Sequence, residues 1–125
     1  MALLTISGRS ALAGSVKDKG DSIYLALGAG DPAWDTTPVA PTSNDTALVA
    51  EIGRRLLTDA WFVVPDAGGD LQTPAGTYAI SNDPTPYLLL RFAFDLADSP
   101  SATIREAGLF INGTVVAGLP VGQRY

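Results

Sequence analysis

Alternating apolar and polar residues mark several short segments of this chain. Apolar side chains recur at every second position over Ser22–Leu27, and again over Tyr87–Asp95, where leucine and phenylalanine share one face. A period of two residues is typical of β-strands. Clusters of β-forming residues favour further strands at Leu3–Ile6 and at Arg54–Val64. We therefore expect a chain that is built mainly from strands.

One segment has the spacing of a short helix, Thr46–Ile52. Its apolar residues recur four positions apart, Asn44 or Asp45 can cap its first turn, and Gly53 can end it. We expect two or three helical turns there. A continuation past Gly53 would allow Glu51 and Arg55 to pair, which contributes only a few tenths of a kcal/mol.

The pair Asn112-Gly113 separates two apolar stretches, Ala102–Phe110 and Thr114–Ala117. Both residues tolerate a positive φ, so the pair predicts a tight turn and an antiparallel hairpin. The complete pattern gives six or seven strands and one short helix. This balance predicts a mainly β fold, an antiparallel β-sandwich-like domain with one short helix and long Pro/Gly-rich loops.

Two segments show no period of either kind. Residues 28–44 contain three prolines and two glycines, and we expect a long irregular loop there. Long loops in compact domains are often functional, so this loop is a candidate contact surface, and its Trp34 is either an interface residue or a lid on the core. Residues 118–125 are apolar and are expected to form an extended C-terminal tail ending at Tyr125.

Composition adds limits to this picture. The 125 residues fit a single domain over residues 1–125, and 13 glycines and 9 prolines agree with extensive loops. The net charge of −5 makes nucleic acid an unsuitable partner, because binding a phosphate backbone requires a basic face. The start of the chain lacks a signal sequence, and no apolar run is long enough to cross a bilayer, so we expect no membrane association and assembly in a host cytoplasm.

The residues needed for common catalytic chemistry are missing. The chain contains no histidine and no cysteine, which excludes imidazole and thiolate sites, disulfides and the usual nucleophilic triads. Four pairs of aspartates remain, but each pair touches a predicted loop where we expect water to keep both carboxylates ionised. Gly28-Ala29-Gly30 lacks the third glycine and the helix of a dinucleotide site, so it is interpreted as a turn. We expect no enzyme activity, no cofactor and no metal.

Arg105 and Glu106 are two opposite charges within an apolar run. Neighbours in a strand point to opposite faces, so one of the two side chains must face inward or toward another strand. A buried charge there destabilises the fold unless it is paired. An internal partner such as Asp95 or Glu51 for Arg105 is the favoured interpretation, and a partner on another subunit is the alternative. The interface or structural candidates are Trp34, Trp61, Arg54, Arg105, Glu106 and Tyr125.

Three runs occur in a recognisable order: YLALGAG, then TALVAEIGRR, then IREAGLF after LLLRFAFD. This order resembles the N-terminal region of phage tail-collar and tail-fibre proteins, in which runs similar to TALVNEVGR and IREIGLFD follow one another. The resemblance covers about residues 22–117, which is most of the chain. Each run is short, so the order and spacing carry the resemblance.

The resemblance implies a virion structural protein of the phage tail or baseplate. The implied role is an assembly module that attaches tail fibres or joins neighbouring tail subunits, with other phage tail, baseplate or fibre proteins as partners, in a homo- or hetero-oligomer. Because the sequence has no fibre shaft or receptor-binding tip before Tyr125, we expect a separate small subunit. The alternative is a carbohydrate-binding adhesin with Trp34, Trp61 and Tyr87 as its sugar platform.

Overall fold

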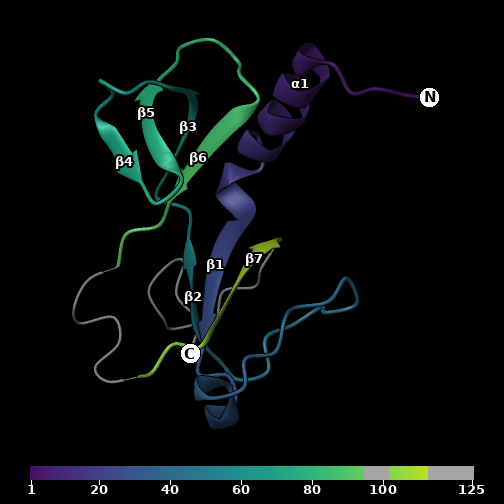
Figure 1. Cartoon of the computed structure of the whole chain (residues 1–125), viewed down its shortest axis with the longest axis vertical. Coiled ribbons are helices and arrows are strands. Elements are labelled where there is room, and N and C mark those ends of the chain that lie inside the picture. The colour runs from purple at the N-terminus through teal and green to yellow at the C-terminus, as the bar shows by residue number, and fades with distance from the viewer. Residues whose placement is uncertain (95–101, 113–125) are drawn as a thin grey trace. The chain divides into compact units, whose positions relative to one another are not determined.

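The computed structural model describes residues 1–94 and 102–112. These residues form two compact units (Figure 1). Unit 1 consists of residues 1–21 and 58–91, and unit 2 consists of residues 22–57 together with the described residues after 91. Within the described ranges there are seven strands in two antiparallel sheets and one α-helix, which confirms the mainly β fold class. That residues 1–125 form one domain stays a prediction.

Unit 1 contains a four-stranded antiparallel sheet in the order β4-β5-β3-β6. Its strands are β3 (Asp59–Pro65), β4 (Leu71–Thr73), β5 (Gly76–Ile80) and β6 (Tyr87–Arg91). Val63 is buried in the central strand. The buried hydroxyl of Thr85 donates to the Val63 carbonyl at 2.7 Å and accepts from the Tyr87 N–H at 3.2 Å. This hydroxyl satisfies main-chain groups at the point where the chain enters β6.

Helix α1 (Ile6–Lys17) packs against β3 and β6 of unit 1. Thr5 caps it, because its side-chain oxygen accepts the Gly8 N–H at 3.1 Å, and Lys17 lies at its carboxyl end over the Phe62 ring. The predicted strand at Leu3–Ile6 is therefore wrong. Three serines and two glycines dilute the apolar period of the helix, so its pattern did not show in the sequence.

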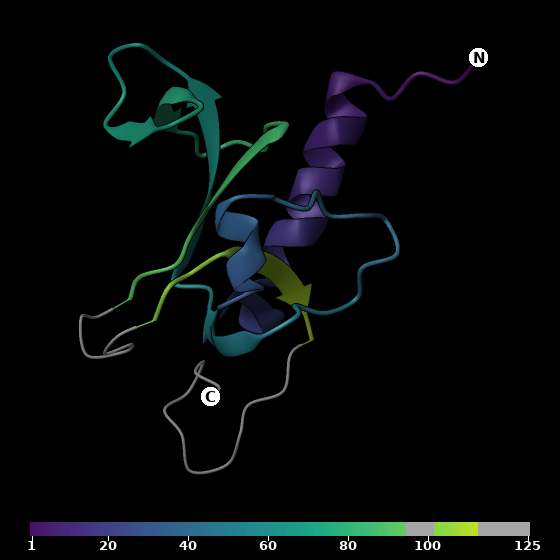
Figure 2. The ribbon, with the colours of Figure 1, turned by 60° about the horizontal axis from the view of Figure 1, so that its bottom comes forward.

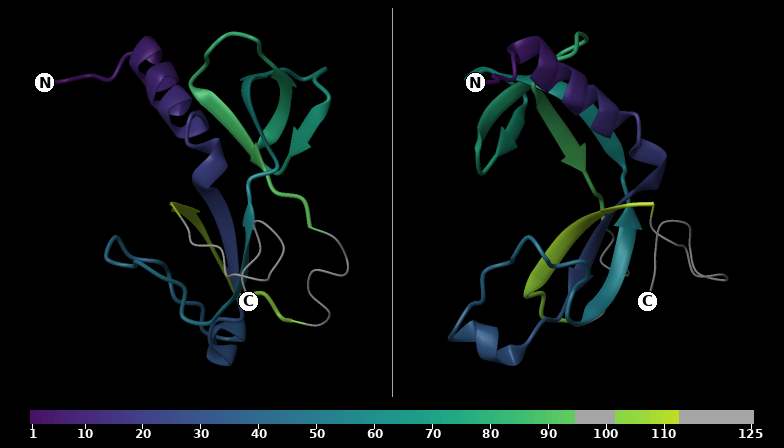
Figure 3. Two further views of the ribbon diagram at one scale, coloured as in Figure 1. Left: turned by 180° about the vertical axis from the view of Figure 1, so that it is seen from behind. Right: turned by 90° about the vertical axis from the view of Figure 1, so that its right-hand side faces the viewer.

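Unit 2 contains a three-stranded antiparallel sheet in the order β2-β1-β7. The central strand β1 (Ile23–Gly28) lies between β2 (Glu51–Leu56) and β7 (Glu106–Ile111), as the two views of Figure 3 show. Ile23, Tyr24 and Ala26 of β1 are buried. The alternation at Ser22–Leu27 thus predicted the strand correctly, and its central place lets β1 pair along both of its edges.

Two boundary predictions around β2 are wrong. Thr46–Ile52 is not a helix, because Glu51 begins β2 and pairs with β1. The expected strand at Arg54–Val64 is two strands, β2 and β3, which belong to different sheets. The break falls at Leu57 and Thr58, where no glycine or proline signals it. The Leu57 N–H still reaches the Ile23 carbonyl of unit 2, whereas the Thr58 N–H bonds to the Arg91 carbonyl of unit 1.

The remaining predictions concern the C-terminal half. The strand expected at Tyr87–Asp95 is observed as β6, which ends at Arg91; Asp95 lies outside the described residues. Asn112 has a φ of 63°, as the predicted turn requires. The second hairpin strand at Thr114–Ala117, the tail at residues 118–125 and the candidate Tyr125 all lie outside the described residues.

A long connection joins β1 to β2 in unit 2. It contains the 3₁₀ turn η2 (Pro32–Asp35), and a second 3₁₀ turn, η1 (Gly20–Ser22), precedes β1. After η2 the connection extends away from the sheet before it returns to β2 (Figure 2). The residues between η2 and β2 form no helix or strand, which agrees with the irregular loop predicted at residues 28–44. We refer to residues 29–50 as the anchored loop.

Candidate functional site

Glu106 holds the returning end of the anchored loop. Its two carboxylate oxygens accept the N–H groups of Ala50 at 2.7 Å and of Val49 at 2.9 Å. Hydrogen bonds from neutral donors to an ionised acceptor are stronger than ordinary ones. Glu106 begins β7, so this side chain fixes the entry to β2 against a strand that lies 56 residues further along the chain.

The path of the Glu106 side chain requires a glycine at position 28. Gly28 lies opposite Glu106 in the β1–β7 register. A Cβ on Gly28 would lie 2.4 Å from the Glu106 Oε1 and 2.6 Å from its Cγ, well inside contact distance. Glu106 therefore reaches the loop by crossing directly over the Gly28 Cα, and only glycine leaves room for it.

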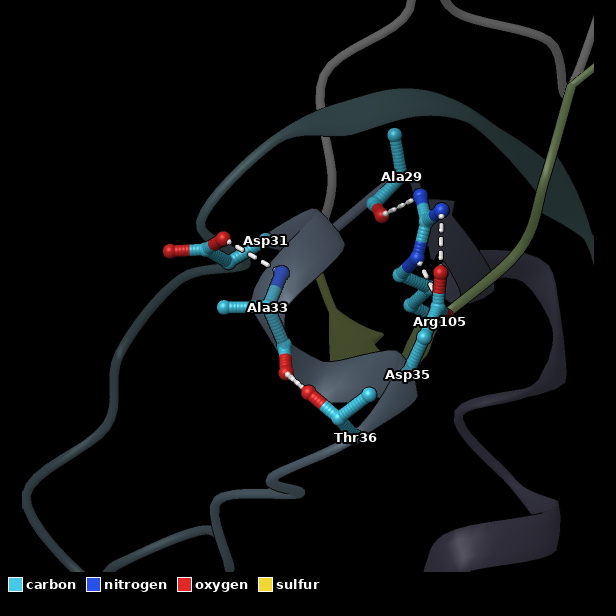
Figure 4. A network of polar contacts seen from close by, with 6 residues as sticks. All are labelled: Ala29, Asp31, Ala33, Asp35, Thr36 and Arg105. Carbon is cyan, nitrogen blue, oxygen red and sulfur yellow. Dashed lines mark hydrogen bonds and ion pairs between the residues drawn. The ribbon is translucent and has the colours of Figure 1, made fainter.

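Arg105 holds the other end of the anchored loop, as Figure 4 shows. Its guanidinium donates to both carboxylate oxygens of Asp35, at 2.8 and 2.9 Å, and to the Ala29 carbonyl at 3.1 Å. Such bidentate pairing fixes both distance and orientation. The hydrogen bonds from Arg105 lower the pKa of Asp35 below its ordinary value, and those to Asp35 raise the pKa of Arg105. The pair remains charged at neutral pH.

The turn before η2 positions the Asp35 carboxylate. Asp31 caps η2 by accepting the Ala33 N–H at 2.9 Å (Figure 4). Gly30 has a φ of 59°, and a Cβ there would lie 2.5 Å from the Trp34 ring. Trp34 therefore packs against the Gly30 backbone and is half-buried, so its ring covers its own loop. Trp34 also lines the groove described below.

Arg54 supports the same face of the sheet from β2. Its guanidinium lies 4.4 Å from the centroid of the Phe110 ring and pairs with Glu51 at 2.6 Å. Only 11% of the Arg54 side chain is exposed, so this stacked ion pair is largely desolvated. The Leu48 side chain of the loop lies against Gly108 of β7, beside the Phe110 ring. Both of these Arg54 contacts are made within unit 2.

The anchored loop and β7 enclose a groove of about 960 Å³. Its apolar lining includes Val39, Leu48 and Val49 from the loop and Leu109 and Ile111 from β7. Four of these five residues, all except Leu48, are exposed. An open groove with apolar walls and fixed loop ends suits the binding of a protein segment.

Trp61 lies in unit 1 and takes no part in this groove. The Arg91 guanidinium lies 5.4 Å from the centroid of its ring, and Arg91 also pairs with Asp59 on the neighbouring strand. Tyr87 of the same unit stands 6.3 Å from Tyr78, centroid to centroid. Trp61 therefore has its ring occupied by a cation of its own unit, as Trp34 has its ring against its own loop.

The site offers contacts and no reactive constellation within the described ranges. No group of three acidic side chains there converges on a position suitable for a metal ion. Helices in this part of the chain are too short to traverse a lipid bilayer.

The sequence identified the charged residues Arg105 and Glu106 that fix the loop ends, but it did not identify their partners. Arg105 was expected to pair with Asp95 or Glu51, whereas its carboxylate partner is Asp35, and Glu51 pairs with Arg54. Glu106 uses two main-chain amides, which leave no trace in a pattern of side chains. The glycines at positions 28 and 30 were the available signal, since they stand where Glu106 and Trp34 approach the backbone.

A family model described as "Baseplate wedge 3 tail fiber network component" matches residues 1–125. The comparison with curated proteins gives no match. The matched range includes both units and the complete anchored loop.

Proposed function

The chain belongs to the family of baseplate wedge 3 tail fiber network components, and from this premise we propose that it joins tail fibres or neighbouring tail subunits through the anchored loop. It is thus a structural protein of the phage tail baseplate. The attachment role rests on one observation above others. The groove between the anchored loop and β7 exposes apolar side chains on a loop whose two ends are fixed by Arg105 and Glu106.

Fixing the loop ends favours binding for a physical reason. A flexible loop loses conformational entropy when it docks, and this loss reduces the affinity. In unit 2 this ordering is completed during folding, because the Glu106 and Arg105 contacts are internal. An exposed surface that is already ordered can bind its partner with little further loss.

The proposed activity is assembly and not catalysis. The partners are other proteins of the tail, baseplate or fibres, in a homo- or hetero-oligomeric particle. The acidic character of the chain, with a net charge of −5, supports a protein partner with basic residues and disfavours nucleic acid.

Substitution of the groove surface tests this role. In Val39→Lys/Val49→Lys, two exposed apolar side chains of the groove become charged. We expect at least a tenfold loss of the protein from purified particles, together with a loss of infectious titre, in phage that depend on this variant. The thermal unfolding of the purified variant should remain unchanged, because both side chains point into water.

The matched control carries the same charges on unit 1. Val64 and Ile80 are exposed apolar residues on β3 and β5. Val64→Lys/Ile80→Lys should enter particles at the normal level. Normal incorporation of the groove variant would contradict the proposal, whatever the control does.

A further inference from the structure

The outer edge of β7 is left without a strand by the described residues. In the order β2-β1-β7, β7 has β1 on one side only. The Asn112 N–H donates to the directly opposite Ser22 carbonyl at 2.8 Å. Hydrogen bonding alternates along an antiparallel pair, so Phe110 and Gly108 also direct their main-chain groups to β1. Ala107, Leu109 and Ile111 then direct theirs to the outer edge.

The opposite side of β1 confirms this alternation. Ile23 gives its carbonyl to the Leu57 N–H on the β2 side, whereas Ser22 gives its carbonyl to β7. Successive residues of β1 thus bond to alternate neighbours, as a central strand requires. The parity of the β7 residues follows from the register in which Leu25 faces Leu109.

The side chains along this edge are apolar and exposed. Leu109 is 58% exposed and Ile111 is 52% exposed, and both line the groove. Across the groove, Val39 and Val49 of the anchored loop are 66% and 71% exposed. An edge strand with unpaired main-chain groups and an apolar rim is a template for another strand.

The charge of the groove indicates which strand fits. Its charged lining residues are three carboxylates and one guanidinium, which give a net charge of −2. The guanidinium of Arg105 is engaged by Asp35. The pKa of Asp45 is lowered by the N–H and the hydroxyl of Thr42, which both donate to it, so its carboxylate stays ionised at neutral pH. A basic residue on the incoming strand would complement this charge.

Resting on the attachment function above, we propose that the outer edge of β7 accepts an extended strand of another tail subunit. This strand carries apolar side chains at alternate positions and a basic residue toward Asp45. Main-chain hydrogen bonds to Ala107, Leu109 and Ile111 supply affinity, and the apolar groove selects the side chains. The three-stranded sheet of unit 2 thereby becomes four-stranded in the particle.

Amide hydrogen exchange tests the strand directly. Particles are assembled with isotopically labelled full-length protein, exchanged in heavy water, dissolved under quench conditions and read residue by residue. We expect the amides of Ala107, Leu109 and Ile111 to exchange at least tenfold more slowly in particles than in the free protein. The amides of Gly108 and Phe110 should be slow in both, since they bond to β1.

Three outcomes would overturn the proposal. Unchanged exchange at Leu109 in particles would show that no strand is added. Slow exchange at Leu109 in the dilute free protein would show that another part of the same chain occupies the edge. Slowing in the free protein that grows with concentration would identify a second copy as the occupant. Each can occur while the Val39→Lys/Val49→Lys variant still fails to assemble, so the edge and the attachment function are judged separately.

A pair of substitutions at Leu109 supplies an independent test. Leu109→Pro removes the outward N–H, which β1 does not use, and proline is tolerated at such edge positions. Leu109→Ala removes the side chain and keeps the N–H. We expect the proline variant to enter particles at least tenfold less than the alanine variant, with similar thermal unfolding for the two. Equal incorporation would contradict strand addition.

Discussion

The contacts that fix the two ends of the loop bring side chains so close to the backbone of two residues that only glycine fits there. Glu106 crosses the Gly28 Cα to reach the amides of Val49 and Ala50. A glycine in β1 weakens strand propensity, because it has no side chain to pack. Gly28 is nevertheless required, because the Glu106 side chain passes directly over its Cα. The same logic applies to Gly30, where a positive φ and the Trp34 ring both exclude a Cβ.

Gly28→Ala should destabilise the protein by displacing Glu106. The new Cβ would overlap Oε1 and Cγ of that side chain, so both hydrogen bonds from main-chain N–H groups to Glu106 would be lost. The cost would be about 1–3 kcal/mol in the free energy of unfolding. Glu106→Ala should cost a similar amount. In the double variant the obstruction is gone, so its loss should be well below the sum of the two single losses. Denaturant unfolding of the four proteins measures this coupling.

A glycine outside the anchor is the control for this cycle. A Cβ on Gly68 would meet only the Asp66 carboxylate at 3.6 Å, an ordinary contact. Gly68→Ala should change stability little and should add independently to Glu106→Ala. Strict additivity of Gly28→Ala with Glu106→Ala would show that the crossing does not exist in solution.

The Asp35–Arg105 pair should make the loop anchor sensitive to acid. Arg105 lowers the pKa of Asp35 in the folded protein. The stabilisation is therefore complete above the pKa of an unfolded aspartate, about 3.9, and is lost as the pH falls through the lower folded value. Trp34 fluorescence in a Trp61→Phe background should stay constant from pH 7 to pH 5 and change below about pH 4.

Asp35→Asn separates this transition from the titration of other carboxylates. Asp45 is one such carboxylate, because its pKa is also lowered, by its hydrogen bonds from Thr42. In the Asn variant, Trp34 should already show the altered fluorescence at pH 7, and the change below pH 4 should shrink. An unaltered acid transition in that variant would show that Asp35 does not govern the anchor.

At the scale of elements, the sequence predicted strands where alternation was strong and failed where it was diluted. Ser22–Leu27 and the start of Tyr87–Asp95 were correct, because their apolar residues keep a period of two. Helix α1 was missed because glycine and serine interrupt its apolar positions. Leu48 and Ile52 have helical spacing, but pairing with β1 outweighed that local preference in the second half of Thr46–Ile52.

The site was predictable to a similar extent. Arg105 and Glu106 were identifiable from the cost of charges in an apolar strand. Their partners were not identifiable. Asp35 lies 70 residues away, and the Val49 and Ala50 partners are main-chain N–H groups, which nearly every residue has. A groove between a loop and a strand edge depends on tertiary contacts that no local pattern contains.

Helix α1 offers a stabilising substitution that tests its placement. Gly14 lies within the helix, and a Cβ there would meet the Phe62 ring at 3.7 Å, an ordinary contact. Gly14→Ala should raise the free energy of unfolding by about 0.5–1 kcal/mol, because alanine restricts the unfolded chain and favours the helix. Gly8→Ala is the comparison: its Cβ would lie 2.7 Å from Leu4, so its gain should be smaller. A loss of stability in Gly14→Ala would contradict the packing of α1 against β3.

At the scale of the whole molecule, the two units differ in the surfaces that they offer to other proteins. Unit 1 combines α1 with a four-stranded sheet, and its aromatic rings are engaged by its own side chains. Unit 2 carries the anchored loop, the groove and the edge of β7 with which no described strand pairs. The family description names a component of a baseplate network, and networks are held together by contacts between subunits. We propose that unit 2 makes those contacts.

Photo-crosslinking within purified particles tests that assignment most directly. A photoreactive amino acid replaces Val39 in the groove or, in a parallel preparation, Ile80 on unit 1. Both sites are exposed, and both variants are irradiated in assembled particles at equal occupancy. We predict that position 39 crosslinks in high yield to a different tail or fibre subunit and that position 80 does not. Crosslinks from position 80 alone, with none from position 39, would contradict the central claim that the anchored loop attaches this protein to its neighbours.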